Sequence, residues 1–176
     1  MATTKWVLDP THSEITFKVK HLMISNVKGE FRNFTATIDS ESDDFSNAKV
    51  QANVETDSIF TNNDDRDNHL KSADFFDVEN NKEITFTGFS FEKTDDDEFD
   101  LTGDLTINGV TKPVTLEVEF GGINQDPWGN TKAGFTFKGK LNREDFGLTW
   151  NAALETGGVM VSKEVKIYGE LQFVKQ

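Results

Sequence analysis

The 176-residue chain contains no cysteine. A disulfide framework, a thiolate nucleophile and a metal site built on thiolates are therefore excluded. The chain also lacks any run near the ~20 apolar residues that a membrane-spanning helix needs. Its first residues carry no apolar segment of signal-peptide length. We therefore expect a cytoplasmic protein without stable membrane insertion, or a periplasmic one if a leader has been removed.

Basic residues are scarce, because 18 Lys and Arg stand against 31 Asp and Glu, for a net charge of −13. Nucleic-acid binding needs clustered cations that release counterions from phosphates, so it is not expected. The same balance argues against peripheral docking on anionic lipid. The simplest interpretation of the acidity is a solvated surface that keeps the protein soluble.

Common catalytic motifs are missing as well. The three histidines, His12, His21 and His69, have neither H-x-x-x-H nor H-x-H spacing. No G-x-S-x-G elbow and no glycine-rich phosphate loop is present. We predict no metal site and no cofactor. An enzyme that uses these histidines for metal or acid–base chemistry is the alternative.

The sequence does contain many segments in which apolar and polar residues alternate. Between Ser13 and His21, every second residue from Ile15 onward is apolar until the histidine closes the row. This period of two predicts a half-buried β-strand. Asn108-Gly109 is a strong hairpin turn signal. Further strands are predicted over residues 5–8, 26–38, 48–56, 83–92, 98–107, 114–120, 133–141 and 165–173.

Two features predict that these strands close into a barrel. The apolar set changes parity near Asn33 and at Gly88, as a β-bulge would make it. In addition, glycines fall within the apolar rows, where they let strands coil tightly or leave space. These glycines are Gly29, Gly103, Gly139 and Gly169. The fold class is therefore all-β, an eight-stranded antiparallel barrel in a single domain (1–176), with a short helical insertion around residues 62–75.

The interior of such a barrel is either filled or hollow. The 16 phenylalanines, many of them on the apolar rows, favour an apolar tunnel. A filled barrel that acts only through its surface, for instance as a stress-response interaction protein, is the other interpretation.

A few polar residues stand out near the predicted strand ends and insertions. They are His21, Arg66, His69 and Arg143. For the arginines the simple expectation is a surface ion pair, Arg66 with Asp65 or Asp67 and Arg143 with Glu144 or Asp145. The sharper hypothesis is that these residues meet a polar head group at the mouth of the tunnel.

Several sequence blocks, in the same order, resemble the YceI-like family of lipocalin-like polyisoprenoid-binding proteins. The blocks are W-V-L-D-P-T-H-S-E-I-T-F-K-V-K-H at 6–21, V-K-G-E-F at 27–31, S-I-F-T-N-N-D-D-R-D-N-H-L-K-S-A-D-F-F-D at 58–77, T-G-D-L-T-I-N-G-V-T-K-P-V at 102–114 and N-R-E-D-F-G-L at 142–148. One departure is Asn80-Asn81-Lys82, where the family usually has an aromatic-Pro pair. The resemblance implies a lipocalin-like barrel that binds, and transports or stores, a long isoprenoid such as a polyprenyl diphosphate or a polyprenyl quinone, with no established catalytic reaction.

The predicted partner is thus a long-chain isoprenoid or another amphiphilic lipid, and a homodimer is compatible with exposed strand edges. The predicted ligand-binding residues are Phe17, Val19, His21, Phe31, Arg66, His69, Phe86, Leu101, Phe135, Phe137, Arg143 and Ile167.

Overall fold

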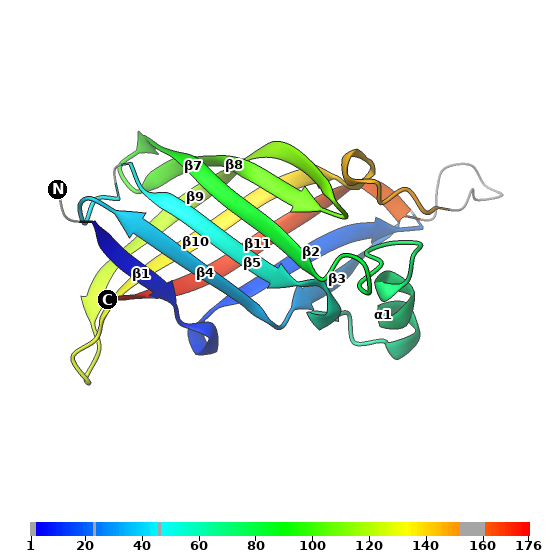
Figure 1. Cartoon of the computed structure of the whole chain (residues 1–176), viewed down its shortest axis with the longest axis horizontal. Helices are drawn as coiled ribbons and strands as arrows, with labels where there is room; N and C mark the ends of the chain where they lie inside the picture. Colours follow the sequence, from blue (N-terminus) through cyan, green and yellow to red (C-terminus); the bar gives the residue numbers. More distant parts are fainter. Residues whose placement is uncertain (1–2, 23, 46, 152–160) are drawn as a thin grey trace.

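The computed structural model describes residues 3–22, 24–45, 47–151 and 161–176, and within them the chain forms one antiparallel sheet (Figure 1). Its strands are β1 (Thr4–Leu8), β2 (Glu14–His21), β3 (Ser25–Phe31), β4 (Phe34–Ser40), β5 (Lys49–Glu55), β6 (Ile59–Phe60), β7 (Glu83–Asp95), β8 (Glu98–Ile107), β9 (Val110–Gln125), β10 (Thr131–Asn142) and β11 (Val161–Lys175). The connections contain the 3-10 helices η1 (Pro10–His12), η2 (Thr56–Ser58) and η3 (Arg143–Phe146), and the α-helix α1 (Asp64–Lys71). No helix in these ranges is long and apolar enough to cross a bilayer.

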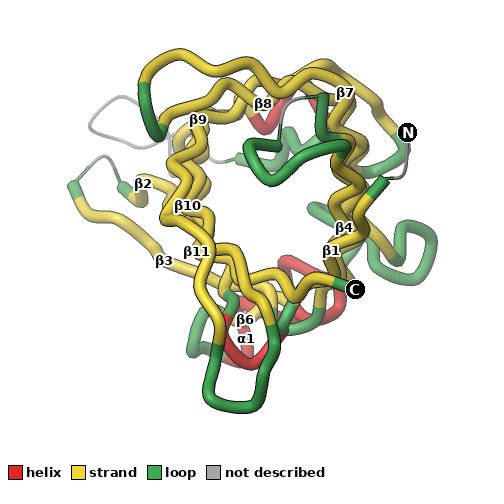
Figure 2. Tube along the Cα trace, turned by 90° about the vertical axis from the view of Figure 1, so that its left-hand side faces the viewer, coloured by secondary structure: helices red, strands yellow, loops and turns green. Residues whose placement is uncertain are grey.

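The sheet closes through the pairing of its first and last strands. The ring runs β1-β4-β5-β7-β8-β9-β10-β11, and β1 then pairs with β11, which places Leu8 opposite Phe173. Figure 2 shows this ring end-on. The predicted eight-stranded antiparallel barrel is confirmed. The hairpin between β8 and β9 is confirmed too, since Asn108 and Gly109 both have positive φ (55° and 75°).

The N-terminal part of the wall is made of interrupted strands. β1 and β2 both pair with β11 and are separated by η1. Arg32 and Asn33 separate β3 from β4, so the strand predicted over 26–38 is two strands. The interruption brings Phe31 and Phe34 to the same interior, as the parity change predicted. β2, β3 and β6 extend the wall beyond the ring toward α1 (Figure 1).

The second predicted parity change is a register shift between Gly88 and Ser90, where β7 pairs with β8. After it, Phe91 faces inward and its ring stacks on Phe99 at a centroid distance of 4.3 Å. The parity change at Gly88 predicts Phe89 on the same inner face as Phe91, because the two share one parity, and this prediction is wrong. Phe89 is the extra residue of the bulge, so its side chain points outward and is 58% exposed.

A cluster of aromatic rings closes the barrel at the end opposite α1. The loop between β4 and β5 folds inward there (Figure 2) and carries Phe45, which is 1% exposed. Its ring lies 5.3 Å from Trp6, 5.4 Å from Phe120 and 5.1 Å from Phe135. Phe135 also contacts Phe173 at 5.9 Å. We call these five residues the aromatic plug. The φ of Phe45 is 60°, an unfavourable value for a bulky residue, which the surrounding packing must offset.

Candidate functional site

A cavity of about 620 Å³ occupies the barrel between the aromatic plug and α1. Its volume falls in the range of roughly 300–1,000 Å³ that small-molecule sites have. The interior is therefore not filled, and the filled-barrel interpretation is wrong. Among the apolar side chains that line the cavity are Ile15, Phe17, Val19, Phe31, Phe34, Val54, Phe86, Leu101, Leu116, Phe137, Val165, Ile167 and Leu171.

Glycines on the inner face keep this cavity hollow, as their place in the apolar rows predicted. Gly169 lies opposite Phe137, and Gly29 lies opposite Phe17. A Cβ on either glycine would overlap the facing ring. Each ring therefore lies over the glycine on the neighbouring strand and leaves the centre of the barrel free. The same close approach recurs in the pairs Gly103 with Phe86 and Gly139 with Leu116.

A second cavity, of about 530 Å³, lies beyond the aromatic plug. Phe120 of the plug faces this second space, whereas Phe173 of the plug faces the main cavity. The plug therefore separates the two spaces. The second cavity is lined by Asp43, Asp44, Asn47, Phe91, Lys93, Asp96, Asp97, Phe99 and Phe120.

Apart from Thr35 of β4, the polar residues of the main cavity come from the end of β2, from α1 with its approach, and from η3. Three of them are cationic and one is anionic, which reverses the charge balance of the whole chain. This end of the cavity, the mouth, therefore favours an anionic or strongly polar group. The mouth residues are Lys20, His21, Thr61, Asn63, Asp65, Arg66, His69 and Arg143.

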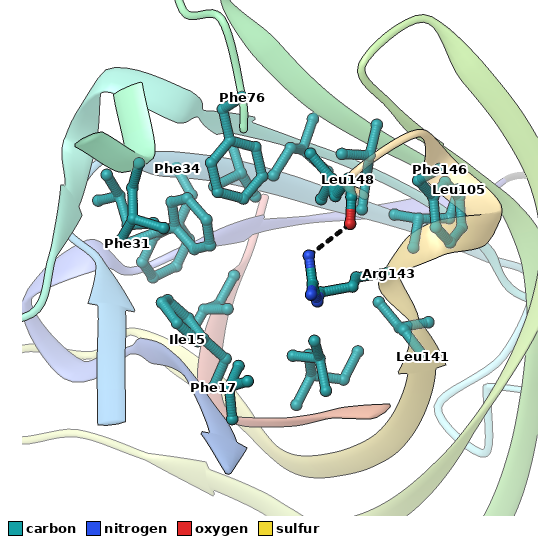
Figure 3. Close-up of a pocket in the computed structure, with 18 of the residues that line it drawn as sticks. Ile15, Phe17, Phe31, Phe34, Phe76, Leu105, Leu141, Arg143, Phe146 and Leu148 are labelled. Atoms are coloured by element: carbon teal, nitrogen blue, oxygen red, sulfur yellow. Dashed lines mark hydrogen bonds between the residues drawn. The ribbon is translucent and has the colours of Figure 1, made fainter. Parts of the chain in front are cut away.

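Arg143 is the most deeply buried of these polar residues, with 4% of its surface exposed. Its guanidinium points among apolar side chains and donates to the carbonyl of Leu148 (Figure 3) and to two further backbone carbonyls. The bonds run from Nε to Ser162 O (2.9 Å), from Nη1 to Leu148 O (2.6 Å) and from Nη2 to Val161 O (3.4 Å). These bonds use three of the five N–H groups that a guanidinium has.

The surface ion pairs predicted for Arg66 and Arg143 with their acidic neighbours are not formed. No carboxylate of the described residues lies within ion-pair distance of either guanidinium. Burial lowers the pKa of Arg143, and the negative charge of Glu144 opposes that shift. Because carbonyl dipoles hold this cation in place of a counter-charge, its positive charge faces the cavity.

The segment before α1 holds Arg66 in place at the mouth. Asn63 caps the helix, since its Oδ1 accepts a hydrogen bond from the Arg66 backbone N–H at 3.0 Å. The buried carboxylate of Asp67 accepts from the Thr61 backbone N–H at 2.9 Å and from its hydroxyl. Arg66 in turn donates from Nε to Thr61 Oγ1 (2.8 Å) and from Nη2 to Thr61 O (2.6 Å). The helix spans Asp64–Lys71 and so lies within the helical insertion predicted around residues 62–75.

His69 closes one side of the mouth. Its Nε2 lies 2.8 Å from Asp74 Oδ2. Its ring meets Phe75 and Trp150 edge to face, at centroid distances of 5.1 and 4.7 Å. These contacts fix the orientation of the imidazole, which places a polar ring between two aromatic side chains at the mouth.

The three histidines are not gathered in one place. His21 and His69 line the main cavity, whereas His12 lies in η1 and pairs with Asp9. Within the described ranges, no group of three or more His, Cys, Asp or Glu residues could hold a metal ion. The alternative of a metal shared by three histidines therefore has no site in this part of the chain.

Eleven of the twelve predicted ligand-binding residues line the main cavity. The exception is Phe135, which belongs to the aromatic plug. Whether a ligand contacts the eleven stays a prediction. Phe34, Phe76 and Trp150 also line the cavity and were not predicted. Phe34 lay in a visible apolar row, but Phe76 and Trp150 come from irregular segments that have no periodic pattern.

Comparison with known proteins adds four likenesses. Residues 6–173 match the family described as YceI-like domain. A UPF0312 protein of Staphylococcus epidermidis is 44% identical over 171 residues, which cover 97% of each chain. The crystal structure of a Campylobacter jejuni YCEI protein is 36% identical with a TM-score of 0.76, covering 89% of this chain and 90% of that one. A polyisoprenoid binding domain from Saccharophagus degradans, implicated in plant cell wall breakdown, has a TM-score of 0.68 at 17% identity, covering 97% and 98%. At this low identity, the likeness concerns the fold alone.

Proposed function

The chain belongs to the YceI-like family, and on that premise we propose that its cavity binds a long-chain isoprenoid lipid, of the polyprenyl diphosphate or polyprenyl quinone type, for transport or storage. The observation that carries this proposal is the apolar cavity of about 620 Å³ with its polar mouth. The polyisoprenoid binding domain of similar fold supports the class of ligand.

Burial of the tail gives affinity but little selectivity. Each buried methylene contributes ~0.8 kcal/mol, so a tail of several prenyl units would account for a very low Kd in water. A membrane buries the same carbons equally well, and this contribution nearly cancels when the lipid moves between membrane and protein. Selectivity must therefore come from the length of the cavity and from contacts with the head group.

The head group is assigned to the mouth because the cationic side chains of the cavity gather there. Arg143 and Arg66 keep N–H groups beyond those bonded to carbonyl and hydroxyl oxygens. A diphosphate or a quinone carbonyl would accept from them. Because a charge-assisted hydrogen bond contributes about 1.5–3 kcal/mol, we expect Arg66→Gln to weaken binding of a polyprenyl diphosphate by about 10- to 100-fold, and that of the uncharged polyprenol much less. Titration of both lipids measures this difference.

Native mass spectrometry of protein purified from its own host tests the main proposal. We expect a bound lipid that extraction identifies as an isoprenoid, and the same spectrum gives the subunit count, which tests the expected homodimer. Phe137→Glu places a carboxylate in the apolar wall and should abolish lipid retention. Phe89→Glu, the same change on the outer face of β7, should leave it intact.

Circular dichroism of both variants verifies that the barrel still folds. A folded Phe137→Glu variant that co-purifies with as much lipid as Phe89→Glu would contradict binding in the barrel. Wild-type protein without any bound isoprenoid, and unable to take one up from micelles, would also reject the proposal.

A further inference from the structure

Four lysines form a continuous row across the outside of the barrel near its mouth. Lys28 of β3 lies opposite Lys18 of β2, Lys18 lies opposite Lys166 of β11, and Lys166 lies opposite Lys140 of β10. Residues that face each other on antiparallel strands point to the same side of the sheet. Three of the four are exposed, and Lys18 is half-buried. We call this set the lysine row.

The lysine row has no acidic partners among the described residues, although the chain is rich in Asp and Glu. Like charges directly opposite each other destabilise a sheet. Even so, no carboxylate of the described residues lies within ion-pair distance of these four ammonium groups. Elsewhere on the barrel a cross-strand row alternates in sign, since Lys5 and Lys49 both lie opposite Asp39. The lysine row thus has the charge pattern that an external anionic surface would neutralise.

An apolar hairpin tip stands next to the lysine row. Leu22 is 37% exposed and Ile24 is 82% exposed, in the turn from β2 to β3. Leu22 also has a φ of 53°, which is unfavourable for an apolar side chain and is better suited to Asn or Gly. Lys20 and His21, which precede this tip, line the main cavity. The tip therefore lies beside the cavity mouth, where exposed apolar side chains indicate contact with an apolar phase.

We propose that this face docks on an anionic lipid bilayer. Leu22 and Ile24 enter the interface between head groups and acyl chains, and the lysine row lies against the anionic head groups. Apolar insertion combined with cationic attraction is how peripheral proteins bind such surfaces. Tyr168, whose ring lies 5.5 Å from Lys18 Nζ, adds a side chain of the type enriched at membrane interfaces. Docked in this way, the cavity opens toward the bilayer.

The distribution of charge leads to a different expectation from the net charge alone. A net charge of −13 argues against binding to anionic lipid only if the charges are mixed evenly. Here the four lysines of the lysine row lie on one face, and the acidic remainder of the surface is repelled by the same membrane. The protein therefore approaches with the mouth foremost, because its charge asymmetry orients it in the field of the surface.

Flotation with vesicles tests this proposal without any isoprenoid present. One set of vesicles contains equal parts of phosphatidylglycerol and phosphatidylcholine, and the other contains phosphatidylcholine alone. We expect binding to the first set only, weakening as salt is added. Lys18, Lys28 and Lys166 changed together to Gln should reduce the partition coefficient by about 100-fold, at roughly fivefold per lysine. The matched control changes Lys5, Lys49 and Lys93 to Gln, which alters the net charge equally.

The apolar tip is tested separately. Leu22→Asn combined with Ile24→Ser should reduce the partition coefficient by about tenfold or more, since two exposed apolar side chains no longer leave water. Trp128→Ser, which removes a residue that is 83% exposed in the distant β9–β10 turn, should leave it unchanged. Equal losses in test and control variants would overturn the proposal, and so would no binding of the wild type at low salt. Because these vesicles contain no isoprenoid, the result does not depend on whether the cavity binds one.

Discussion

Gly169→Ala tests whether the pairs of glycine and aromatic ring keep the cavity open. An alanine Cβ at this position would overlap the ring of Phe137, so the ring must leave its place over the neighbouring strand. The free space beside it is the cavity, and the ring is expected to swing there. A group the size of benzene needs about 150 Å³, which is about a quarter of the 620 Å³ available.

The loss of this volume should shorten the buried part of a tail by about one prenyl unit. About five carbons at ~0.8 kcal/mol each amount to about 4 kcal/mol, or roughly a thousandfold in Kd. Overpacking should also lower the free energy of unfolding by about 1–3 kcal/mol. In a domain of this size, that lowers Tm by roughly 2–12 °C.

The assay is a titration with a fluorescent polyprenyl analogue, together with thermal unfolding. Gly134→Ala is the matched control, because a Cβ there would meet nothing within 4 Å. Combining Gly169→Ala with Phe137→Leu gives the side chain more freedom to adjust and should recover part of the affinity. If Gly169→Ala binds the analogue as tightly as Gly134→Ala does, the reasoning is refuted.

Three further predictions concern other parts of the barrel. Asp9→Asn should lower Tm at pH 7, because the bond from Lys132 holds the pKa of Asp9 far below its ordinary value of 3.8. In thermal scans the difference from wild type should shrink as the pH falls below 3.8, because the unfolded wild-type chain then takes up a proton that folded Asp9 does not, and the stabilisation is lost. Asn63→Ala should cost about 1 kcal/mol, seen as faster amide hydrogen exchange in α1, and unchanged exchange would contradict the capping role. Phe135→Ala should cost about 3–5 kcal/mol and join the two cavities, so that native mass spectrometry finds longer bound tails; tails of unchanged length would show that the plug does not limit them.

Much of the barrel could be predicted because alternation is a local property of the sequence. In a strand with one buried face, the apolar residues must point inward, so their parity also reveals where the strand is interrupted. This is how the breaks near Asn33 and Gly88 could be located. The outward turn of Phe89 could not be predicted, because parity does not say which residue of a bulge is the extra one.

Features that depend on the register between strands distant in sequence could not be predicted from the sequence alone. The lysine row joins residues more than 100 positions apart, and each lysine taken alone is an ordinary outward position on a strand. Phe45 escaped prediction because it is a single apolar residue in an acidic loop, with no periodic pattern to mark it as buried. The arginine partners were predicted wrongly because proximity in sequence suggested carboxylates, whereas Arg143 reaches carbonyls up to 19 residues away.

The aromatic plug blocks the main cavity at the end opposite α1, where it separates this cavity from the second one. If the proposed lipid enters through the mouth, its tail must go in first, and its head group then stays at the mouth. A membrane or protein that accepts the lipid would then contact the head group first. The head group can therefore be recognised while the tail is still bound in the cavity.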